Sequence, residues 1–381
     1  MQHQSTFIFN FRLTSAFFFS SSMNCGWRDL YKYSRELRNK HPLVGFLVQQ
    51  SFNSVVILQI VANVYEFYVY TFIVCGRLLE SWFQVSIYLV VFCFLFVMMI
   101  WSLVVTKLTA TSHVDSIFKV SKEVDEQLKR NTPQTKDGVY IPDYSSPQEI
   151  AEQYRILRKW IYENELTGHI AEVDFRGRIR YCYICNAIKS DRARHCSTSG
   201  FCIKRYDHYC VFLNSCICYS NYKAYFLYLF YGWLTHSIII TTIEGIARFY
   251  LNGNYLRDVY DLLQVGVCIA LQVHFGFHIL GELFCYHLQM VLKNETTVEQ
   301  LKPPFFRENA DYNIGIYLNL RAVLGWGFWL FPLNTKVDDG THFPIDYKDP
   351  NLPEEEKFIC QKIVEESQES GIQSETNNSV V

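Results

Sequence analysis

The chain has 381 residues, of which half are hydrophobic and 19% are charged, and its formal net charge is −2. This balance predicts no partner from bulk charge, and the scattered basic residues adjoin apolar runs, which argues against nucleic-acid binding. The length would permit two or three soluble domains. The apolar residues, however, are gathered into long blocks. We therefore expect a membrane protein.

Four apolar runs are long enough to cross a bilayer, whose core of about 30 Å needs about 20 helical residues. Residues 85–106 carry no charge, residues 224–242 carry one histidine, and residues 55–74 and 262–284 carry several polar groups.

The connection between the second and third runs, 107–223, holds 18 Lys and Arg, whereas the two short connections hold one and two. Basic residues stay on the cytoplasmic side, so we expect the middle region and both termini to be cytosolic.

The predicted organisation follows from these runs. It comprises a cytosolic segment 1–54, two spans within 55–106, a cytosolic region 107–223, two spans within 224–284 and a cytosolic region 285–381. A helix should begin at Pro147, since Ser146 can cap it and Glu149 follows at the third position. The acidic, polar tail after residue 338 is predicted to be disordered. Whether residues 1–22 belong to the natural protein stays open, as does the compartment, endomembrane or plasma membrane.

A cysteine patch lies in the cytosolic region. Disulfides are rare in the cytosol, so clustered cysteines predict metal ligands or nucleophiles. Cys182 and Cys185 stand two residues apart, and His195 and Cys202 follow after a loop. Three thiolates and an imidazole can complete one tetrahedral, structural zinc site. The alternative is four separately buried residues.

A second group, Asp207, His208 and Cys210, lies within the run "RYDHYCVFLNSC". An acid, an imidazole and a thiol this close could bind metal, perform chemistry or do neither. An imidazole can take a thiol proton, and a carboxylate can fix the imidazole tautomer.

The run from Cys182 to about Phe230, "CYICNAIKSDRARHCSTSGFCIKRYDHYCVFLNSCICYSNYKAYFLYLF", resembles the cysteine-rich domain of the DHHC protein S-acyltransferases. "TTVE" at 296–299 resembles the TTxE motif of that family, and "NADYNIGIYLNLRAVLG" resembles its C-terminal Asn-containing motif. Because position 209 is tyrosine, the run Asp207–Cys210 resembles the Asp-His-Tyr-Cys motif of a fungal subgroup of the family.

The resemblance implies an α-helical polytopic membrane protein. It would have four transmembrane helices and a cytosolic zinc-binding cysteine-rich domain (182–223) between the second and third. Cys210 would take a palmitoyl group from acyl-CoA and pass it to cysteines of membrane-associated proteins, with His208 as base and Asp207 as its orienting group. Thr297 would contact Asp207, and Thr296 and Glu299 would help to position it. Asn221 would be structural. Protein substrates, acyl length and oligomeric state stay open.

The resemblance also assigns zinc ligands. The first site maps onto Cys182, Cys185, His195 and Cys202. The second maps onto Cys196, Ser199, Tyr209 and Cys216, where a hydroxyl and a phenol are poor zinc ligands. We therefore expect one zinc ion, with Tyr209 packed into the vacated space, while Cys218 is an alternative substitute ligand.

Other interpretations concern function and the remaining polar residues. A catalytically inactive zinc-bearing scaffold is the alternative function, while the ligand pattern of a RING ligase and the several histidine boxes of an iron hydroxylase are missing. His274, His278 and Glu282 share one helical face and are expected to face the bundle interior, while a metal site within the membrane is the alternative. Glu66 is also expected to face inward, unless the first span is shifted. Basic residues around the patch could hold the CoA phosphates or form a solvated face. These residues are Arg178, Arg180, Lys189, Arg192, Arg194, Lys204 and Arg205.

Overall fold

The computed structural model describes residues 33–34, 37, 40–130, 132–134, 140, 147–238, 243, 259–306, 309–335 and 339–348. The predictions for residues 1–22, for the end of the third span (239–242) and for most of the acidic tail lie outside these residues. The chain divides into two units. The first unit is Met1–Ile60 with Val211–Asn214, and the second comprises Val61–Cys210 and Ser215–Val381.

The described part of the first unit contains helix α2 (Pro42–Ser51), which begins with proline in its first turn, where the missing N–H costs nothing. Asn214 Nδ2 donates to Asn53 Oδ1 at 2.9 Å and joins the two stretches of this unit. All of the groups with candidate chemistry lie in the second unit.

Long apolar helices form one part of the structure. Helix α3 (Ser54–Tyr68) continues into the π-helix η1 (Val69–Leu78), and helix α4 (Trp82–Leu108) follows. Helix α9 (Val259–Leu271), the π-helix η4 (Gln272–Leu280) and helix α10 (Gly281–Lys293) run on as one rod. The three continuous helices, Ser54–Leu78, Trp82–Leu108 and Val259–Lys293, are long and apolar enough to cross a membrane. They coincide with the first, second and fourth predicted spans.

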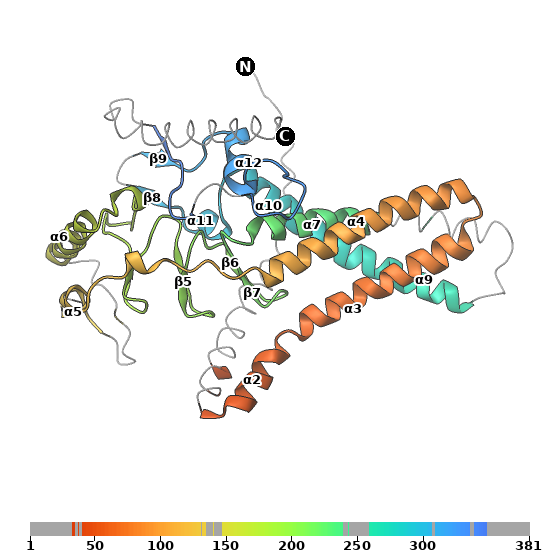
Figure 1. Cartoon of the computed structure of the whole chain (residues 1–381), viewed down its shortest axis with the longest axis horizontal. Helices are drawn as coiled ribbons and strands as arrows, with labels where there is room; N and C mark the ends of the chain where they lie inside the picture. Colours follow the sequence, from red (N-terminus) through yellow and green to blue (C-terminus); the bar gives the residue numbers. More distant parts are fainter. Residues whose placement is uncertain are drawn as a thin grey trace, which may run out of the picture. The chain divides into compact units, whose positions relative to one another are not determined.

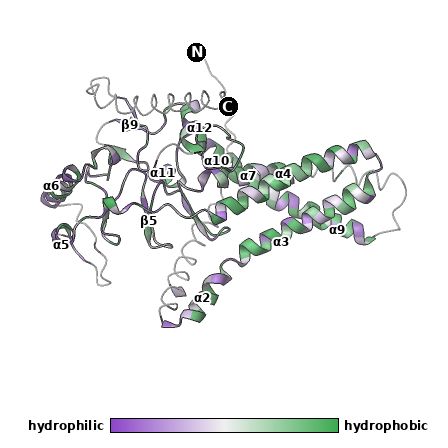
Figure 2. Cartoon of the chain, in the orientation of Figure 1, coloured by the Kyte–Doolittle hydropathy of each residue, from purple (hydrophilic) through white to green (hydrophobic). Residues whose placement is uncertain are grey.

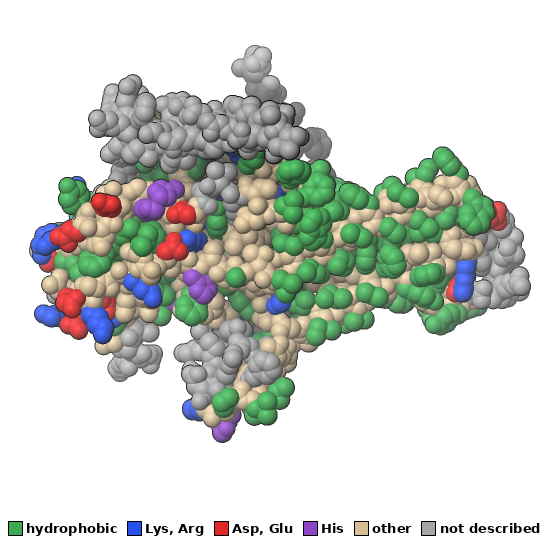
Figure 3. Space-filling model, viewed as in Figure 1, with side chains coloured by type: hydrophobic (Ala, Val, Ile, Leu, Met, Phe, Trp, Pro, Cys, Tyr) green, Lys and Arg blue, Asp and Glu red, His purple; other side chains and the backbone are tan. Residues whose placement is uncertain are grey.

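Helix α7 (Tyr222–His236) occupies the position of the third predicted span and packs along α4 (Figure 1). Most of its side chains are buried. The outer faces of the other helices carry exposed apolar side chains, among them Trp82, Val90 and Val61. Green covers much of α3, α4 and α9 in Figure 2, and hydrophobic side chains cover much of the helical surface in Figure 3. Apolar surface this extensive requires lipid rather than water around it.

Polar groups within these helices differ in orientation. Glu66 is buried, and its carboxylate lies 2.9 Å from Nδ1 of His236 on α7, so the expectation that Glu66 faces inward is confirmed. The same expectation was wrong for His274, His278 and Glu282, which are exposed. The three residues do share one face, as their four-residue spacing predicted, but that face is exposed rather than turned toward the other helices.

The remaining part is a more polar domain built of short hairpins and two amphipathic helices. Helix α6 (Pro147–Glu163) begins at Pro147 as expected and buries Leu157 and Ile161. It packs with α5 (Lys122–Arg130) over a core that includes Phe118. Antiparallel hairpins follow: β2 (Tyr181–Cys182) with β3 (Ala187–Ile188), β4 (Arg194–Cys196) with β5 (Phe201–Ile203), and β6 (His208–Cys210) with β7 (Ser215–Ile217).

The segment after α10 returns to this domain. Helix α11 (Thr297–Leu301) comes first, and strand β8 (Phe305–Phe306) pairs with β1 (Glu172–Val173). Strand β9 (Ala310–Asp311) pairs with β10 (Asp346–Tyr347), and α12 (Ile316–Leu324) lies between them in sequence. Asn319 of α12 is fully buried and donates to the carbonyl of Leu292 at 2.7 Å, which fastens α12 to the end of α10.

Candidate active site

Four predicted ligands meet between the first two hairpins. Cys182 ends β2 and Cys185 follows in the turn, which Asn186 closes at φ 53, a left-handed conformation that asparagine tolerates. His195 and Cys202 are direct partners across β4 and β5. One ligand atom from each of the four residues lies within 4.8 Å of the others.

The donor set fits zinc. Nδ1 of His195 lies 3.5 Å from Cys182 Sγ, 3.3 Å from Cys185 Sγ and 3.9 Å from Cys202 Sγ. Typical Zn–S and Zn–N bonds in a tetrahedron separate nitrogen from sulfur by about 3.6 Å. A hydrogen bond from Cys202 lowers the pKa of Cys182 to about 3, and the same bond raises the pKa of Cys202. One thiol of this pair is thus held as the thiolate that a metal binds.

The degenerate second group is a packed thiol pair. Cys196 and Cys216 place their Sγ atoms 3.5 Å apart. Tyr209 packs against the core that contains them, as expected for a side chain that fills a vacated ligand site. Cys218 Sγ instead lies 3.4 Å from the hydroxyls of Ser112 and Ser220. Within the described part of the chain, no third His, Cys, Asp or Glu completes a cluster with the pair.

Asp207, His208 and Cys210 lie along one edge of the third hairpin. Asp207 is fully buried, and its Oδ2 is 2.5 Å from Nδ1 of His208. Cys210 is 7% exposed and forms a hydrogen bond with His208. Because Nδ1 faces the carboxylate, Nε2 is the imidazole nitrogen left for the thiol.

Burial and hydrogen bonding set the charges of this group. Burial alone would raise the pKa of Asp207, but the hydrogen bond and charge of His208 and the Thr297 backbone N–H hold it well below its usual range. Burial would lower the pKa of His208, whereas the hydrogen bonds to Asp207 and Cys210 raise it to about 10. At neutral pH the pair is therefore a carboxylate beside an imidazolium.

The "TTVE" motif fixes Asp207 from the other side. Thr296 caps α11, and its hydroxyl and the Glu299 carboxylate form a reciprocal capping box. The helix start places the backbone N–H of Thr297 2.8 Å from Asp207 Oδ1 and its hydroxyl 2.9 Å from Oδ2. Both carboxylate oxygens are thus held, and the contact expected between Thr297 and Asp207 is present.

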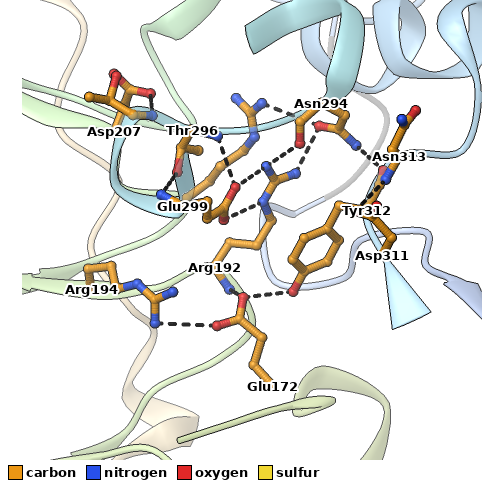
Figure 4. A network of polar contacts seen from close by, with 12 residues as sticks. Glu172, Arg192, Arg194, Asp207, Asn294, Thr296, Glu299, Asp311, Tyr312 and Asn313 are labelled. Carbon is orange, nitrogen blue, oxygen red and sulfur yellow. Dashed lines mark hydrogen bonds and ion pairs between the residues drawn. The ribbon is translucent and has the colours of Figure 1, made fainter. Parts of the chain in front are cut away.

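A buried arginine joins this motif to the cysteine-rich domain (Figure 4). Arg192 has no exposed side-chain surface, and Nε and Nη2 donate to the two carboxylate oxygens of Glu299 at 2.9 and 2.7 Å. Nη1 donates to Asn294 Oδ1 at 2.9 Å, and the guanidinium lies 4.4 Å from the ring centre of Tyr312. The Tyr312 hydroxyl donates to Glu172 at 2.8 Å, which extends the network.

This network corrects the expectation for the basic residues. Arg192 contacts protein groups rather than solvent, and Arg180 is buried 2.8 Å from Glu172. Lys204 is buried beside Asp115 at 2.6 Å. The same holds for Arg178, which pairs with Asp174, and for Arg205, which donates to Asn294. Neither a CoA phosphate site nor a solvated face describes these five side chains, because they are buried and their charged groups contact internal acids and carbonyl oxygens.

One residue near the site, His287, was not predicted from the sequence. His287 on α10 places Nδ1 3.0 Å from the Tyr222 hydroxyl, and its ring centre lies 5.9 Å from that of His208. It groups with Asp207 and His208 within 4.8 Å. The available signal was a histidine in an apolar run shortly before "TTVE". Asn221, expected to be structural, caps the Cys218 backbone N–H and donates to Cys216 O and Thr106 O.

Comparisons with known proteins agree with this geometry. A family model described as DHHC palmitoyltransferase matches residues 176–304. Palmitoyltransferase spe-10 of Caenorhabditis elegans is 37% identical over 343 residues, which cover 87% of this chain and 94% of the relative. Palmitoyltransferase ZDHHC2 of Danio rerio is 30% identical over 301 residues, covering 76% and 77%. Palmitoyltransferase ZDHHC15 of Rattus norvegicus is 28% identical over 313 residues, covering 80% and 86%.

Proposed function

Because the chain belongs to the DHHC palmitoyltransferase family and is thereby a protein-cysteine S-palmitoyltransferase, we propose that Cys210 carries the acyl group between donor and substrate. The observation that supports this role most is the chain of hydrogen bonds that leads from helix α11 to the thiol. Thr297 holds Asp207, Asp207 holds His208, and His208 bonds to Cys210. A nucleophile, a base and an orienting acid in this order are the parts that thiol catalysis needs.

The proposed reaction has two steps. In the first, the Cys210 thiolate attacks the thioester carbonyl of acyl-CoA, the bond from carbonyl carbon to CoA sulfur breaks, and His208 returns the proton to the departing CoA thiolate. In the second, a thiol of a membrane-associated protein gives its proton to His208 and attacks the new thioester, which releases Cys210. Each step exchanges one thioester for another, so no further energy source is needed.

The cysteine-rich domain would be held by one zinc ion on Cys182, Cys185, His195 and Cys202. The ion would supply structural folding free energy to a region of short strands. The two hairpins that would hold the ion, β2–β3 and β4–β5, would support the third hairpin, β6–β7, and so position Cys210. The thiol pair Cys196 and Cys216 needs no ion in this proposal, because Tyr209 and the surrounding core pack around it.

The proposed topology has four spans, with α7 as the third and both termini in the cytosol. Its segments are 1–54, 55–106, 107–223, 224–284 and 285–381. The ion pair between Arg77 and Asp261, 2.6 Å apart, supports it, because it joins the end of the first span to the start of the fourth. Asn221 reaches Thr106 O near the end of α4, which supports a position for the domain at the cytosolic ends of α4 and α7. Cys210 could then meet CoA in water and the acyl chain in lipid.

A Cys210→Ser variant tests the catalytic role. The full-length protein is expressed with a membrane substrate and labelled with a clickable palmitate, and hydroxylamine-sensitive label is read on enzyme and substrate. Cys285→Ser is the matched control, because Cys285 is an exposed cysteine outside both thiol clusters. We expect label on both proteins with the control and loss of both with Cys210→Ser. Equal labelling by the two variants would contradict the proposal. The inactive scaffold is not favoured, since the relatives carry palmitoyltransferase names.

A further inference from the structure

A second cluster of metal-ligating side chains lies apart from the cysteines and from Cys210. His169 ends the short helix η3 (Thr167–His169), while Asp339 and His342 belong to the segment before β10. One ligand atom from each residue lies within 4.8 Å of the other two. The ring centres of the two imidazoles are 3.6 Å apart. No pattern in the sequence pairs these residues, which are about 170 positions apart.

Thr341 orients His169 within this cluster. Its side chain is buried, and its Oγ1 lies 2.9 Å from His169 Nδ1 and 2.7 Å from Asp339 Oδ1. An ionised carboxylate only accepts hydrogen bonds, so the hydroxyl donates to Asp339 and accepts from Nδ1–H of His169. The lone pair of His169 is then on Nε2. Metal-binding histidines are commonly fixed in this way by a hydrogen bond on their other nitrogen.

We propose that His169, Asp339 and His342 form a site for a divalent transition-metal ion, with Zn²⁺ as the ion that fits best. Two imidazoles and one carboxylate suit zinc and its neighbours better than Mg²⁺ or Ca²⁺, which prefer oxygen ligands. Three protein ligands leave a fourth position for water. The side chains of His342 and Asp339 are 37% and 54% exposed, so an ion can enter from solvent.

The nearby positive charge is already neutralised. Lys204 Nζ donates to the backbone carbonyl of Asp339 at 3.0 Å. The same ammonium lies 2.6 Å from the carboxylate of Asp115. The lysine therefore adds little net repulsion toward a cation, and it fastens the Asp339 backbone to β5 and its neighbours.

A bound ion would brace the segment that covers the Arg192 network. His342 is followed by Phe343, whose ring lies 5.2 Å from the Arg192 guanidinium. On the other side, the carbonyl of His169 accepts from the backbone N–H of Asp191 at 3.0 Å. An ion bound by His169 and His342 would thus link the two chain segments that flank Arg192. This role is separate from the structural role proposed for the zinc ion of the cysteine cluster.

Zinc titration of the full-length protein in detergent tests this site. The protein is first passed over a chelating resin that strips weakly held metal while the cysteine cluster keeps its ion, and Zn²⁺ binding is then followed by calorimetry with metal analysis. We expect one additional zinc per chain. His342→Ala and Asp339→Asn should weaken it at least tenfold, and His113→Ala, which removes an exposed imidazole elsewhere, should leave it unchanged.

Retention of the first zinc by each variant shows that the domain is folded, so loss of the second is not a folding effect. Absence of the additional zinc in the unaltered protein would overturn the proposal, as would equal affinity in His342→Ala and His113→Ala. Acylation of Cys210 by the unaltered protein is measured in parallel and tests the proposed function separately.

Discussion

Replacing Thr297 by valine removes one hydroxyl from the site while the β-branched shape stays. In the native structure that hydroxyl donates to Asp207 Oδ2 at 2.9 Å, beside the 2.5 Å contact from His208 to the same oxygen. The backbone N–H of Thr297 still holds Oδ1 at 2.8 Å. The carboxylate is therefore left with one anchor from α11 and can rotate away from the imidazole.

The expected loss follows from the character of this bond. A hydrogen bond to a charged group contributes about 1.5–3 kcal/mol, and about 1.4 kcal/mol corresponds to a tenfold change in rate. Asp207 is fully buried, so water cannot replace the missing donor. Because the backbone hydrogen bond remains, we expect a loss at the lower end of this energy range. The rate of acyl-enzyme formation should decrease about tenfold, and the decrease should appear in kcat rather than in KM.

The assay is single-turnover acylation of the purified enzyme by palmitoyl-CoA, compared among the native protein, Thr297→Val and Thr297→Ser. The serine variant keeps the donor, so it should stay within about threefold of the native rate. Thermal unfolding of each variant separates misfolding from a catalytic effect. A valine variant that acylates as fast as the serine variant would refute the role assigned to this hydroxyl.

Three further results are expected. Arg192→Met leaves Glu299 buried without its cation and should cost about 3–5 kcal/mol of stability, measured by unfolding in detergent. Adding Glu299→Gln should then cost less than the sum of the two single changes, and strict additivity would argue against the pair. The folded-state pKa of His208 is raised to about 10. Its contribution to stability is therefore complete below the ordinary value of about 6.5 and is lost as pH rises toward 10. The melting temperature should fall over that window, and less so in His208→Gln; parallel curves would contradict this. Cys202→Ala should release the ion of the cysteine cluster and unfold its hairpins, seen by metal analysis and proteolysis, whereas Cys285→Ser should keep both.

The parts of the site that the sequence predicted are mostly local. Cys182, Cys185, His195 and Cys202 lie within one short stretch, so their spacing and two tight hairpins suffice to bring them together. Helix α6 was likewise predicted from its cap, its proline and its apolar spacing. Such features depend on neighbours a few residues away, which sequence patterns record.

The parts that were missed depend on distant partners. Arg192 meets Asn294 and Glu299 more than 100 positions away, and no periodicity marks such a contact. Arg192 was therefore interpreted as a possible ligand of the CoA phosphates or as part of a solvated face, although it is the buried link between two motifs. His287 was missed for the same reason, because its partners Tyr222 and His208 lie on other elements.

The helical register shows a third limit. Four-residue spacing predicted a common inward face for His274, His278 and Glu282. The three residues do share a face, but that face is exposed. Spacing indicates which residues lie on one side of a helix, but it cannot indicate whether that side packs against protein.

Site-resolved mass spectrometry of the full-length enzyme after incubation with palmitoyl-CoA alone tests the role of Cys210 most directly. We predict a hydroxylamine-labile acyl adduct on Cys210 that disappears when a substrate protein with a free cysteine is added. A labile adduct confined to other cysteines, or none on Cys210 while substrate is still palmitoylated, would contradict it.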